Sequence, residues 1–278
     1  MPEPAILITG CSSGIGHDAA HTLSARGWRV LATCRNPADC SRLEAEGLES
    51  FPLDYASDES VADGAERALM LTNGKLAALF NNGAYAIPGL VEDIPRDAFR
   101  EIFETNLFGQ FDLINRLLPS MKQQGVGRIV NCSSILGFAG VPYRGAYNAT
   151  KFAMEGLTDT LRIEHADSPI HFSLIEPGPI TTRIRQNSIP HFERWINWQN
   201  SAQRQRYESL LIPRLYNKQQ ARKDRFELAP SAVTEKLIHA LESASPKPRY
   251  YVTKPTHIAG LMKRLLTTRA FDRLLHKA

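Results

Sequence analysis

The first 26 residues place an apolar strand, a glycine turn and a helix in direct succession. Ala5–Thr9 is a short apolar run of the kind buried in parallel sheets, and a helical pattern extends to Arg26. The glycines between them follow the spacing Gly10-x-x-x-Gly14-x-Gly16. An ordinary tight turn is one interpretation, because glycine serves turns of many kinds. The strand before it and the helix after it favour a turn whose backbone N–H groups surround a pyrophosphate.

The alternation of strand-like and helical stretches continues along the chain. We expect further strands at 28–34, 48–53, 76–80, 127–133, 171–176 and 249–252, and long helical stretches over 97–124 and 147–165. This order predicts right-handed βαβ units, and hence an α/β fold with a doubly wound, Rossmann-type parallel sheet in a single domain of 278 residues. Ligands bind outside the carboxyl ends of such strands. The residues expected there are Arg35, Asp54, Asn81, Ser134 and Pro177.

A hydroxyl group, a phenol and an ammonium group follow the fifth predicted strand. Ser134 precedes Tyr147, and Lys151 lies one helical turn beyond Tyr147 on the same face. The unperturbed pKa of a phenol is about 10, and an ammonium group beside it favours the phenolate. Ser134 would hold a carbonyl or hydroxyl oxygen while Tyr147 gives or takes the proton. The stretch predicts proton chemistry at a carbonyl, with a partner that supplies hydride.

The Tyr-x-x-x-Lys spacing is weak evidence by itself, because chance produces roughly 0.3 copies in such a chain. A helix-start tyrosine packed on the surface is the alternative. A second copy runs from Tyr250 to Lys254. It follows a Pro-Lys-Pro turn in a β-like run, where four residues span about 13 Å and the two side chains cannot meet. The other motifs must therefore decide the function.

The residues after the second predicted strand indicate which dinucleotide binds. An acidic side chain there binds the ribose 2′-hydroxyl of NAD, whereas an arginine accommodates the 2′-phosphate of NADP. The sequence is Thr33-Cys34-Arg35-Asn36, with no acid before Asp39. A solvated surface arginine is the alternative interpretation. We expect NADP(H), with Arg35 at the phosphate and Asp54 near the adenine.

Composition and charge exclude several other functions. The first ten residues contain no long apolar run, so we expect neither a signal peptide nor a membrane anchor. Four cysteines at positions 11, 34, 40 and 132 lack metal-ligand spacing, so we expect reduced thiols, a cytoplasmic protein and no metal site. A net charge of +4 without an aromatic-basic stripe argues against nucleic acid.

Together these motifs resemble those of the classical short-chain dehydrogenases/reductases over residues 5 to 182. The family order Asn-Asn-Ala-Gly is changed here to Asn-Asn-Gly-Ala, which affects the packing near the adenosine. The strings T-G-C-S-S-G-I-G and A-T-C-R resemble the 17β-hydroxysteroid and retinol dehydrogenase branch, whose substrates are apolar carbonyls or alcohols. The matching residues are Thr9-Gly10-x-x-x-Gly14-x-Gly16, Asp54, Asn81-Asn82-Gly83, Asn106, Ser134, Tyr147-x-x-x-Lys151 and Pro177-Gly178.

The resemblance implies a role for each catalytic residue. Tyr147 would be the general acid/base, and Ser134 would orient the substrate oxygen. Lys151 would bind the nicotinamide ribose and lower the pKa of Tyr147, while Asn106 would hold a water that relays protons to solvent. Ile180 and Thr182 would contact the nicotinamide carboxamide.

The resemblance also implies the full cofactor site and an assembly. The chain would form a homodimer or homotetramer through 108–124 and 147–165. The cofactor-binding residues would be Gly10, Ser12, Ser13, Gly14, Ile15, Gly16, Arg35, Asp54, Asn82, Gly83, Tyr147, Lys151, Pro177, Gly178, Ile180 and Thr182.

Two stretches differ from the alternating pattern. Residues 183–229 are rich in Arg, Gln and aromatic residues, which predicts a helical lid over substrate; a surface helical pair with aromatics in the core is the alternative. Residues 257–277 are predicted as one amphipathic helix with a basic face. Such helices lie on membranes in some proteins, but more often they cap a core or a partner subunit, which we expect here.

The predicted function is NADP(H)-dependent reduction of an apolar ketone or aldehyde, or oxidation of the corresponding alcohol, with a steroid-, retinoid- or fatty-aldehyde-like substrate. NAD-dependent alcohol oxidation is one alternative and makes Arg35 incidental. A catalytically silent dinucleotide-binding regulator is the other. The presence of Asn106, Ser134, Tyr147 and Lys151 weighs against the regulator.

Overall fold

A seven-stranded parallel sheet forms the centre of the computed structural model, which describes residues 3–216 and 225–276. The strand order is β3-β2-β1-β4-β5-β6-β7, so strands are added first on one side of β1 and then on the other. This confirms the predicted doubly wound sheet and places a crevice at the carboxyl ends of β1 and β4. The strands are β1 (Ala5–Thr9), β2 (Arg29–Cys34), β3 (Glu49–Pro52), β4 (Leu76–Asn81), β5 (Gly127–Cys132), β6 (Ile170–Glu176) and β7 (Arg249–Tyr251).

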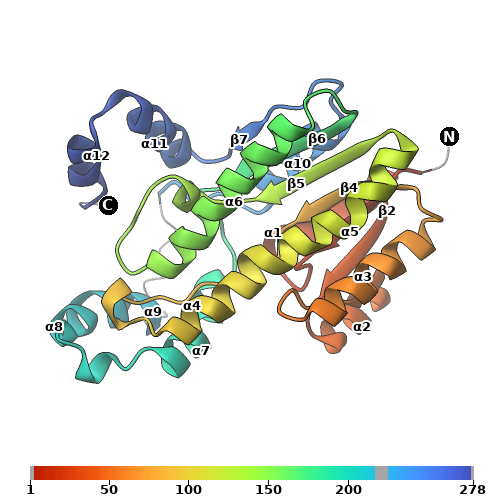
Figure 1. Cartoon of the computed structure of the whole chain (residues 1–278). Coiled ribbons are helices and arrows are strands. Elements are labelled where there is room, and N and C mark those ends of the chain that lie inside the picture. Colours follow the sequence, from red (N-terminus) through yellow and green to blue (C-terminus); the bar gives the residue numbers. More distant parts are fainter. Residues whose placement is uncertain (1–2, 217–224, 277–278) are drawn as a thin grey trace.

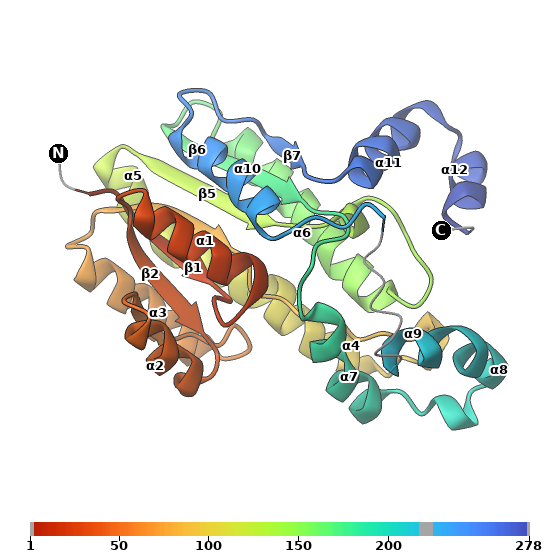
Figure 2. The ribbon, with the colours of Figure 1, turned by 180° about the vertical axis from the view of Figure 1, so that it is seen from behind.

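Helices cover both faces of the sheet, and Figures 1 and 2 look onto opposite faces. Strand residues alternate between the faces, so that Ile6 and Ile8 pack on one side and Leu7 on the other. The first face is covered by α1 (Gly14–Ala25), α2 (Pro37–Ala45) and α10 (Ser231–Glu242), and the second by α3 (Asp58–Leu71), α5 (Gly109–Gln124) and α6 (Gly145–Glu164).

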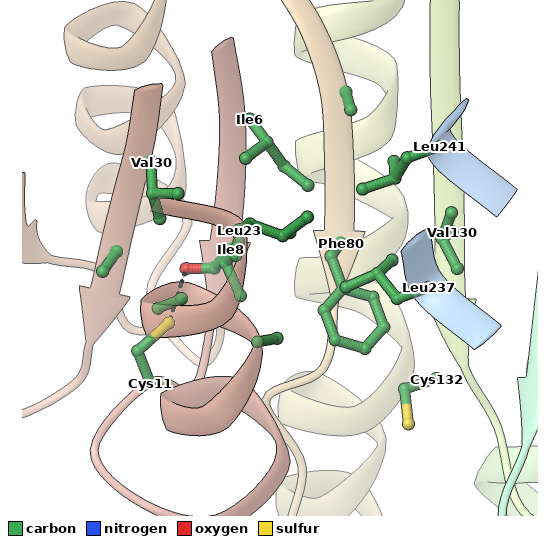
Figure 3. Packing of buried hydrophobic residues seen from close by; sticks show 14 of the residues in the cluster. Ile6, Ile8, Cys11, Leu23, Val30, Phe80, Val130, Cys132, Leu237 and Leu241 are labelled. Carbon is green, nitrogen blue, oxygen red and sulfur yellow. Dashed lines mark hydrogen bonds between the residues drawn. The ribbon is translucent and has the colours of Figure 1, made fainter. Parts of the chain in front are cut away.

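Buried apolar side chains lie between β1, β4 and the helices α1 and α10 (Figure 3). Ile8, Leu23, Phe80 and Leu237 come from these four elements and are fully buried. Burying each such side chain contributes about 1.5–3 kcal/mol. Short strands and helices with one apolar face therefore hold this side of the sheet together.

The helical stretch expected over 97–124 contains an irregular turn. It consists of α4 (Arg96–Phe103), the π-helical turn η2 (Glu104–Phe108) and α5. π-Helical turns are rare and often occur at functional sites. Asn106, one of the predicted catalytic residues, lies in this turn.

The stretch predicted as a lid folds into short helical segments beside α4, below the carboxyl edge of the sheet (Figure 1). Phe192 and Tyr207 are buried, and they belong to the same apolar cluster as Tyr147. Aromatic residues of this stretch thus belong to the core, and a lid function stays a prediction. Residues 217–224 lie outside the described part. The segments are α7 (Ile184–Trp195), η4 (Trp198–Asn200), α8 (Arg204–Arg206), η5 (Tyr207–Leu211) and α9 (Ile212–Tyr216).

The single helix predicted for residues 257–277 is wrong. The structure has two helices, α11 (Lys254–Leu265) and α12 (Thr268–Leu275), which extend past β7 (Figures 1 and 2). Leu266 has a φ of −94° and a ψ of 149°, an extended conformation that ends α11. The break lets Phe271 pack with Phe138 in a small cluster of its own, and Lys277 lies outside the described residues. Among the described helices, none combines the length and apolar character that crossing a membrane requires.

An arginine at the start of β7 joins three carboxylates. Arg249 forms ion pairs with Glu155 and Asp159 of α6 and with Glu176 at the end of β6. Burial raises the pKa of Glu176, the charge of Glu155 raises it further, and Arg249 lowers it. Because Glu176 directly precedes Pro177, this cluster fixes the carboxyl end of β6 against α6.

We expect Arg249→Met to lower the free energy of unfolding by about 3–5 kcal/mol near pH 10, above the pKa of about 9 of Glu176, because it leaves buried carboxylates without their cation. A buried carboxyl whose folded pKa is raised favours folding while it is protonated and loses this advantage as the pH rises through that value. The loss should therefore be smaller at pH 6. Urea denaturation at both pH values measures it.

The control is Arg204→Met, which removes an exposed i,i+4 pair with Glu208 and should leave the midpoint nearly unchanged. An equal loss for Arg249→Met at pH 6 and pH 10 would contradict the carboxylate explanation.

Candidate active site

The end of β1 touches the loop after β4 at the crevice. Gly10 has a φ of +69°, and a Cβ on it would lie 2.6 Å from the Cα of Gly83. Asn82 Nδ2 donates to the carbonyl oxygens of Thr9 at 3.0 Å and Gly10 at 3.3 Å. A Cβ on Gly83 would lie 3.2 Å from Cε2 of Tyr55, so the exchanged order Gly-Ala makes room for this ring.

The N-terminus of α1 opens into the same crevice. Ser13 caps this helix in an extended conformation, but its side chain accepts no hydrogen bond from the first turn, which also lacks acidic residues. The first N–H groups are therefore available, and a helix N-terminus attracts anions. A Cβ on Gly14 would lie 3.1 Å from Cγ2 of Thr182, and one on Gly16 would collide with the Gly10 carbonyl. This glycine cradle fits the pyrophosphate of a dinucleotide.

Two further predicted cofactor residues lie at the ends of β2 and β3. Arg35 is exposed, and its side chain has no hydrogen bond or ion pair with any other described residue. Asp54 Oδ1 accepts a hydrogen bond from the backbone N–H of Ala56 at 3.0 Å, and its own N–H donates to Ser60 Oγ at 2.9 Å. Both residues thus lie at the edge that the sequence predicted.

The remaining predicted contacts come from the loops around the cradle. The carbonyl oxygen of Pro177 accepts from the N–H of Ile135 at 2.8 Å, and Ile180 forms a bridge with Leu228. A Cβ on Gly178 would lie 2.8 Å from Oγ1 of Thr256. These contacts bring the Pro-Gly turn to the end of β5, next to Ser134.

Arg42 is a cradle residue that the sequence analysis missed. Its Nη2 donates to the carbonyl oxygen of Ser12 at 2.7 Å, and its Nη1 donates to Glu46 Oε1 at 2.7 Å. It also pairs with Asp39, whose Oδ1 lies 3.4 Å from Nη2. In the sequence, Arg42 looks like a solvated charged residue on a short helix. Its place on α2, the helix next to the glycine turn, is the signal that could have indicated a contact with the cradle.

Ser134, Tyr147 and Lys151 come together at the carboxyl end of β5. Ser134 Oγ donates to the carbonyl oxygen of Pro177 at 3.5 Å and accepts from the N–H of Leu136 at 3.1 Å. Tyr147 lies in the first turn of α6 and is 8% exposed. Lys151 Nζ is 5.7 Å from the centre of the Tyr147 ring and donates to the Cys132 carbonyl oxygen at 2.7 Å.

The effect of Lys151 on the pKa of Tyr147 stays a prediction. Burial raises the pKa of Tyr147 above its ordinary value, Cys132 adds to this, and Arg144 and a hydrogen bond with Ser134 oppose it. Burial also lowers the pKa of Lys151, whose ammonium group is occupied by the Cys132 carbonyl. In this state the phenol keeps its proton at neutral pH, so it can serve as an acid.

Asn106 ties the π-helical turn to its neighbours. Its Oδ1 accepts from the N–H of Tyr85 at 3.0 Å, and its Nδ2 donates to the Tyr85 carbonyl oxygen at 2.8 Å and to Thr150 Oγ1 at 3.3 Å. The amide group is fully buried. Its side chain thus joins the loop after β4 to α6, and the relay water stays a prediction.

A second missed residue, Arg144, lies three residues before Tyr147. Burial lowers the pKa of Arg144, and the charges of Arg185 on α7 and Arg214 on α9 lower it further. In the described part of the chain, none of these three guanidinium groups forms an ion pair with a carboxylate. The start of α6, together with α7 and α9, therefore carries a group of three arginines, here called the cationic wall, of which Arg185 and Arg214 are exposed.

The second Tyr-x-x-x-Lys sequence, Tyr250 to Lys254, has a structural role. The hydroxyl of Tyr250 lies 2.9 Å from Nδ1 of His239 and accepts from the N–H of Lys247 at 2.8 Å. Lys254 begins α11. Tyr250 therefore anchors β7 to α10, as a structural residue.

Known proteins share this sequence and this arrangement. A family model described as short chain dehydrogenase matches residues 4–192. The uncharacterized oxidoreductase YbbO of Escherichia coli K12 is 39% identical over 273 residues, 98% of this chain and 94% of that protein. Human 17-beta-hydroxysteroid dehydrogenase type 1 is 31% identical over 269 residues, 91% of this chain and 79% of that protein.

A solved structure also has the same fold. The short chain dehydrogenase/reductase of Burkholderia phymatum in complex with NAD superposes with a TM-score of 0.78 at 24% identity, covering 99% of this chain and 95% of that one. The family model, the relatives and the motifs agree. The chain therefore belongs to the short-chain dehydrogenase/reductase family and is an NAD(P)-dependent oxidoreductase.

Proposed function

We propose that this protein is an NADP(H)-dependent carbonyl reductase and alcohol dehydrogenase for apolar ketones, aldehydes or alcohols. The observation that carries the proposal is the meeting of Ser134, Tyr147 and Lys151 beside the glycine cradle. A bound nicotinamide supplies or accepts the hydride. Ser134 would hold the substrate oxygen, Tyr147 would donate its proton to that oxygen as charge develops, and Lys151 would bind the nicotinamide ribose.

The surroundings of Tyr147 support an apolar substrate. The cluster that includes its ring also contains Ile87, Phe192, Leu211 and Leu215, three of which come from the lid segments. Such side chains bind apolar surface and exclude water from the reacting atoms. A protonated phenol can supply the proton that the oxygen of a reduced carbonyl must receive.

We expect Tyr147→Phe to lower turnover of an apolar aldehyde with NADPH by at least about a hundredfold, because the general acid is lost. Binding of NADPH should change little, since most cradle contacts remain. Loss of nicotinamide absorbance measures turnover, and a fluorescence titration measures binding.

The matched control is Tyr250→Phe, which removes the hydroxyl of the structural copy and should retain most of the turnover. Undiminished turnover in Tyr147→Phe would mean that another group donates the proton. Tight NADPH binding by the wild-type protein without turnover of any ketone or aldehyde would favour the silent regulator.

The preference for NADP(H) is supported by two features at the end of β2. Arg35 is exposed beside the cradle and has no described partner. The first acid after it, Asp39, pairs with Arg42 and is not free to bind a ribose hydroxyl. A guanidinium group suits a 2′-phosphate, whereas NAD would need a free carboxylate here.

We expect Arg35→Ala to raise the KM for NADPH by about tenfold or more, because a hydrogen bond to a charged group contributes about 1.5–3 kcal/mol. The KM for NADH should stay the same. Arg100→Ala, on the exposed face of α4, is the control. A wild-type preference for NADH would overturn the assignment and favour NAD-dependent alcohol oxidation.

A second substrate class is favoured by the cationic wall. Arg144 lies three residues before Tyr147 and its charge lowers the pKa of Tyr147, and among the described residues no carboxylate forms an ion pair with Arg144. An apolar carbonyl compound that also carries a carboxylate or phosphate would supply the missing anion. This class shares the chemistry of the first proposal and differs only in the far end of the substrate.

For this class we expect Arg144→Met to raise the KM for an aldehyde with a terminal carboxylate by about tenfold, through loss of a charge-assisted hydrogen bond. The neutral aldehyde of the same length should be affected less than threefold, roughly. Arg144→Lys should restore part of the difference. Equal effects on both aldehydes would exclude the anion-binding role.

A further inference from the structure

Two histidines and a glutamate meet on the surface at the end of α2. His17 and His21 are one turn apart on α1, and Glu46 follows the last residue of α2. Nε2 of His17 lies 2.8 Å, and Nε2 of His21 2.7 Å, from the same carboxylate oxygen, Oε2 of Glu46. The three side chains are between 30% and 37% exposed. Ions in solution can therefore reach all three.

The spacing of the ligand atoms suits a divalent transition metal. The two imidazole nitrogens and the carboxylate oxygen lie within 4.8 Å of one another. In a tetrahedral Zn²⁺ site with bonds of about 2.0–2.2 Å, neighbouring ligand atoms are about 3.3 Å apart. Small movements of the two imidazole rings and of the carboxylate would place a cation between the three groups. Two histidines and one carboxylate leave the fourth position to water.

The carboxylate is already oriented by a neighbouring group. Arg42 Nη1 donates to Oε1 of Glu46 at 2.7 Å, so Oε2 is left to face the histidines. Hydrogen-bonded neighbours that orient a ligand are typical of metal sites.

The described residues offer no second cluster of this kind that would compete for the cation. Within residues 3–216 and 225–276, no second group of three His, Cys, Asp or Glu side chains offers ligand atoms this close together. All four cysteines are buried, which removes the softer thiolate ligands from contact with solvent. The His-x-x-x-His spacing on α1 is also a sequence signal, which a search for cysteine patterns alone overlooks.

We propose that His17, His21 and Glu46 form a binding site for one divalent transition-metal cation of the Zn²⁺ class. The bound cation would join α1 to the end of α2. His17 directly follows Gly16, and Arg42 donates to the carbonyl oxygen of Ser12. The site thus supports the glycine cradle from outside and touches none of the reacting atoms.

Isothermal titration of the full chain, without an affinity tag, with ZnCl₂ tests the site. We expect one Zn²⁺ per chain, and His17→Gln and His21→Gln should each weaken binding by about tenfold or more, since each removes a ligand. His276→Gln removes an exposed histidine on the far side of the chain and should leave binding unchanged. The Co²⁺ complex should show the visible absorption of a four-coordinate site, and this absorption should be lost in His17→Gln.

The melting temperatures measured with and without Zn²⁺ distinguish a metal site from a cluster of hydrogen bonds alone. Stabilisation by Zn²⁺ in the wild-type protein but not in His17→Gln supports coordination. A cluster without a metal role would show a lower melting temperature in both histidine variants and no Zn²⁺ binding by the wild-type protein, which would overturn the proposal. Unchanged Zn²⁺ binding by the double variant His17→Gln/His21→Gln would overturn it as well.

Discussion

Hydrogen bonds at the end of β1 hold the cofactor cradle open, and the rest of the site depends on them. Thr9 Oγ1 accepts from the backbone N–H groups of Asn82 at 3.0 Å and Gly83 at 3.2 Å. The hydroxyl of Tyr55 donates to Oδ1 of Asn81 at 2.6 Å and lies 2.7 Å from Thr9 Oγ1. Leaving one of these buried groups unpaired costs about 1–3 kcal/mol. These hydrogen bonds thus join β1 and β4, the two strands that border the crevice, at the point where the strand order of the sheet changes direction.

The same chain of buried amides reaches the catalytic helix. Asn81 Nδ2 donates to Oδ1 of Asn131 at 3.0 Å, and Asn131 Nδ2 donates to Oγ1 of Thr158 on α6 at 2.9 Å. The cluster around Arg249 holds α6 to the end of β6 from the other side. Because α6 carries Tyr147 and Lys151, these contacts set the position of the proton donor relative to the cradle. Rigid support of this kind is what precise chemistry at a carbonyl requires.

Predictions based on local patterns agree with the structure. The glycine spacing after β1 and the alternation of strands and helices rest on backbone conformation and on which face is apolar, and both are local properties. The convergence of Ser134, Tyr147 and Lys151 was predictable because parallel strands deliver their carboxyl ends to one edge. The homo-oligomer, the lid function and the relay water at Asn106 stay predictions.

The sequence by itself determined the succession of strands and helices and the place of the site, since periodicity and turn residues act within a few positions of the chain. Tertiary structure alone decided the break between α11 and α12, because docking of Phe271 onto Phe138 outweighs one continuous amphipathic face. It also decided the burial of Tyr147, because the ring packs with segments distant in the sequence such as α7 and α9. The charge of Arg144, left without a carboxylate in the described structure, and the meeting of His17 with Glu46 arise in the same way. Each needs residues far apart in the sequence to come together, and no local pattern records their distance.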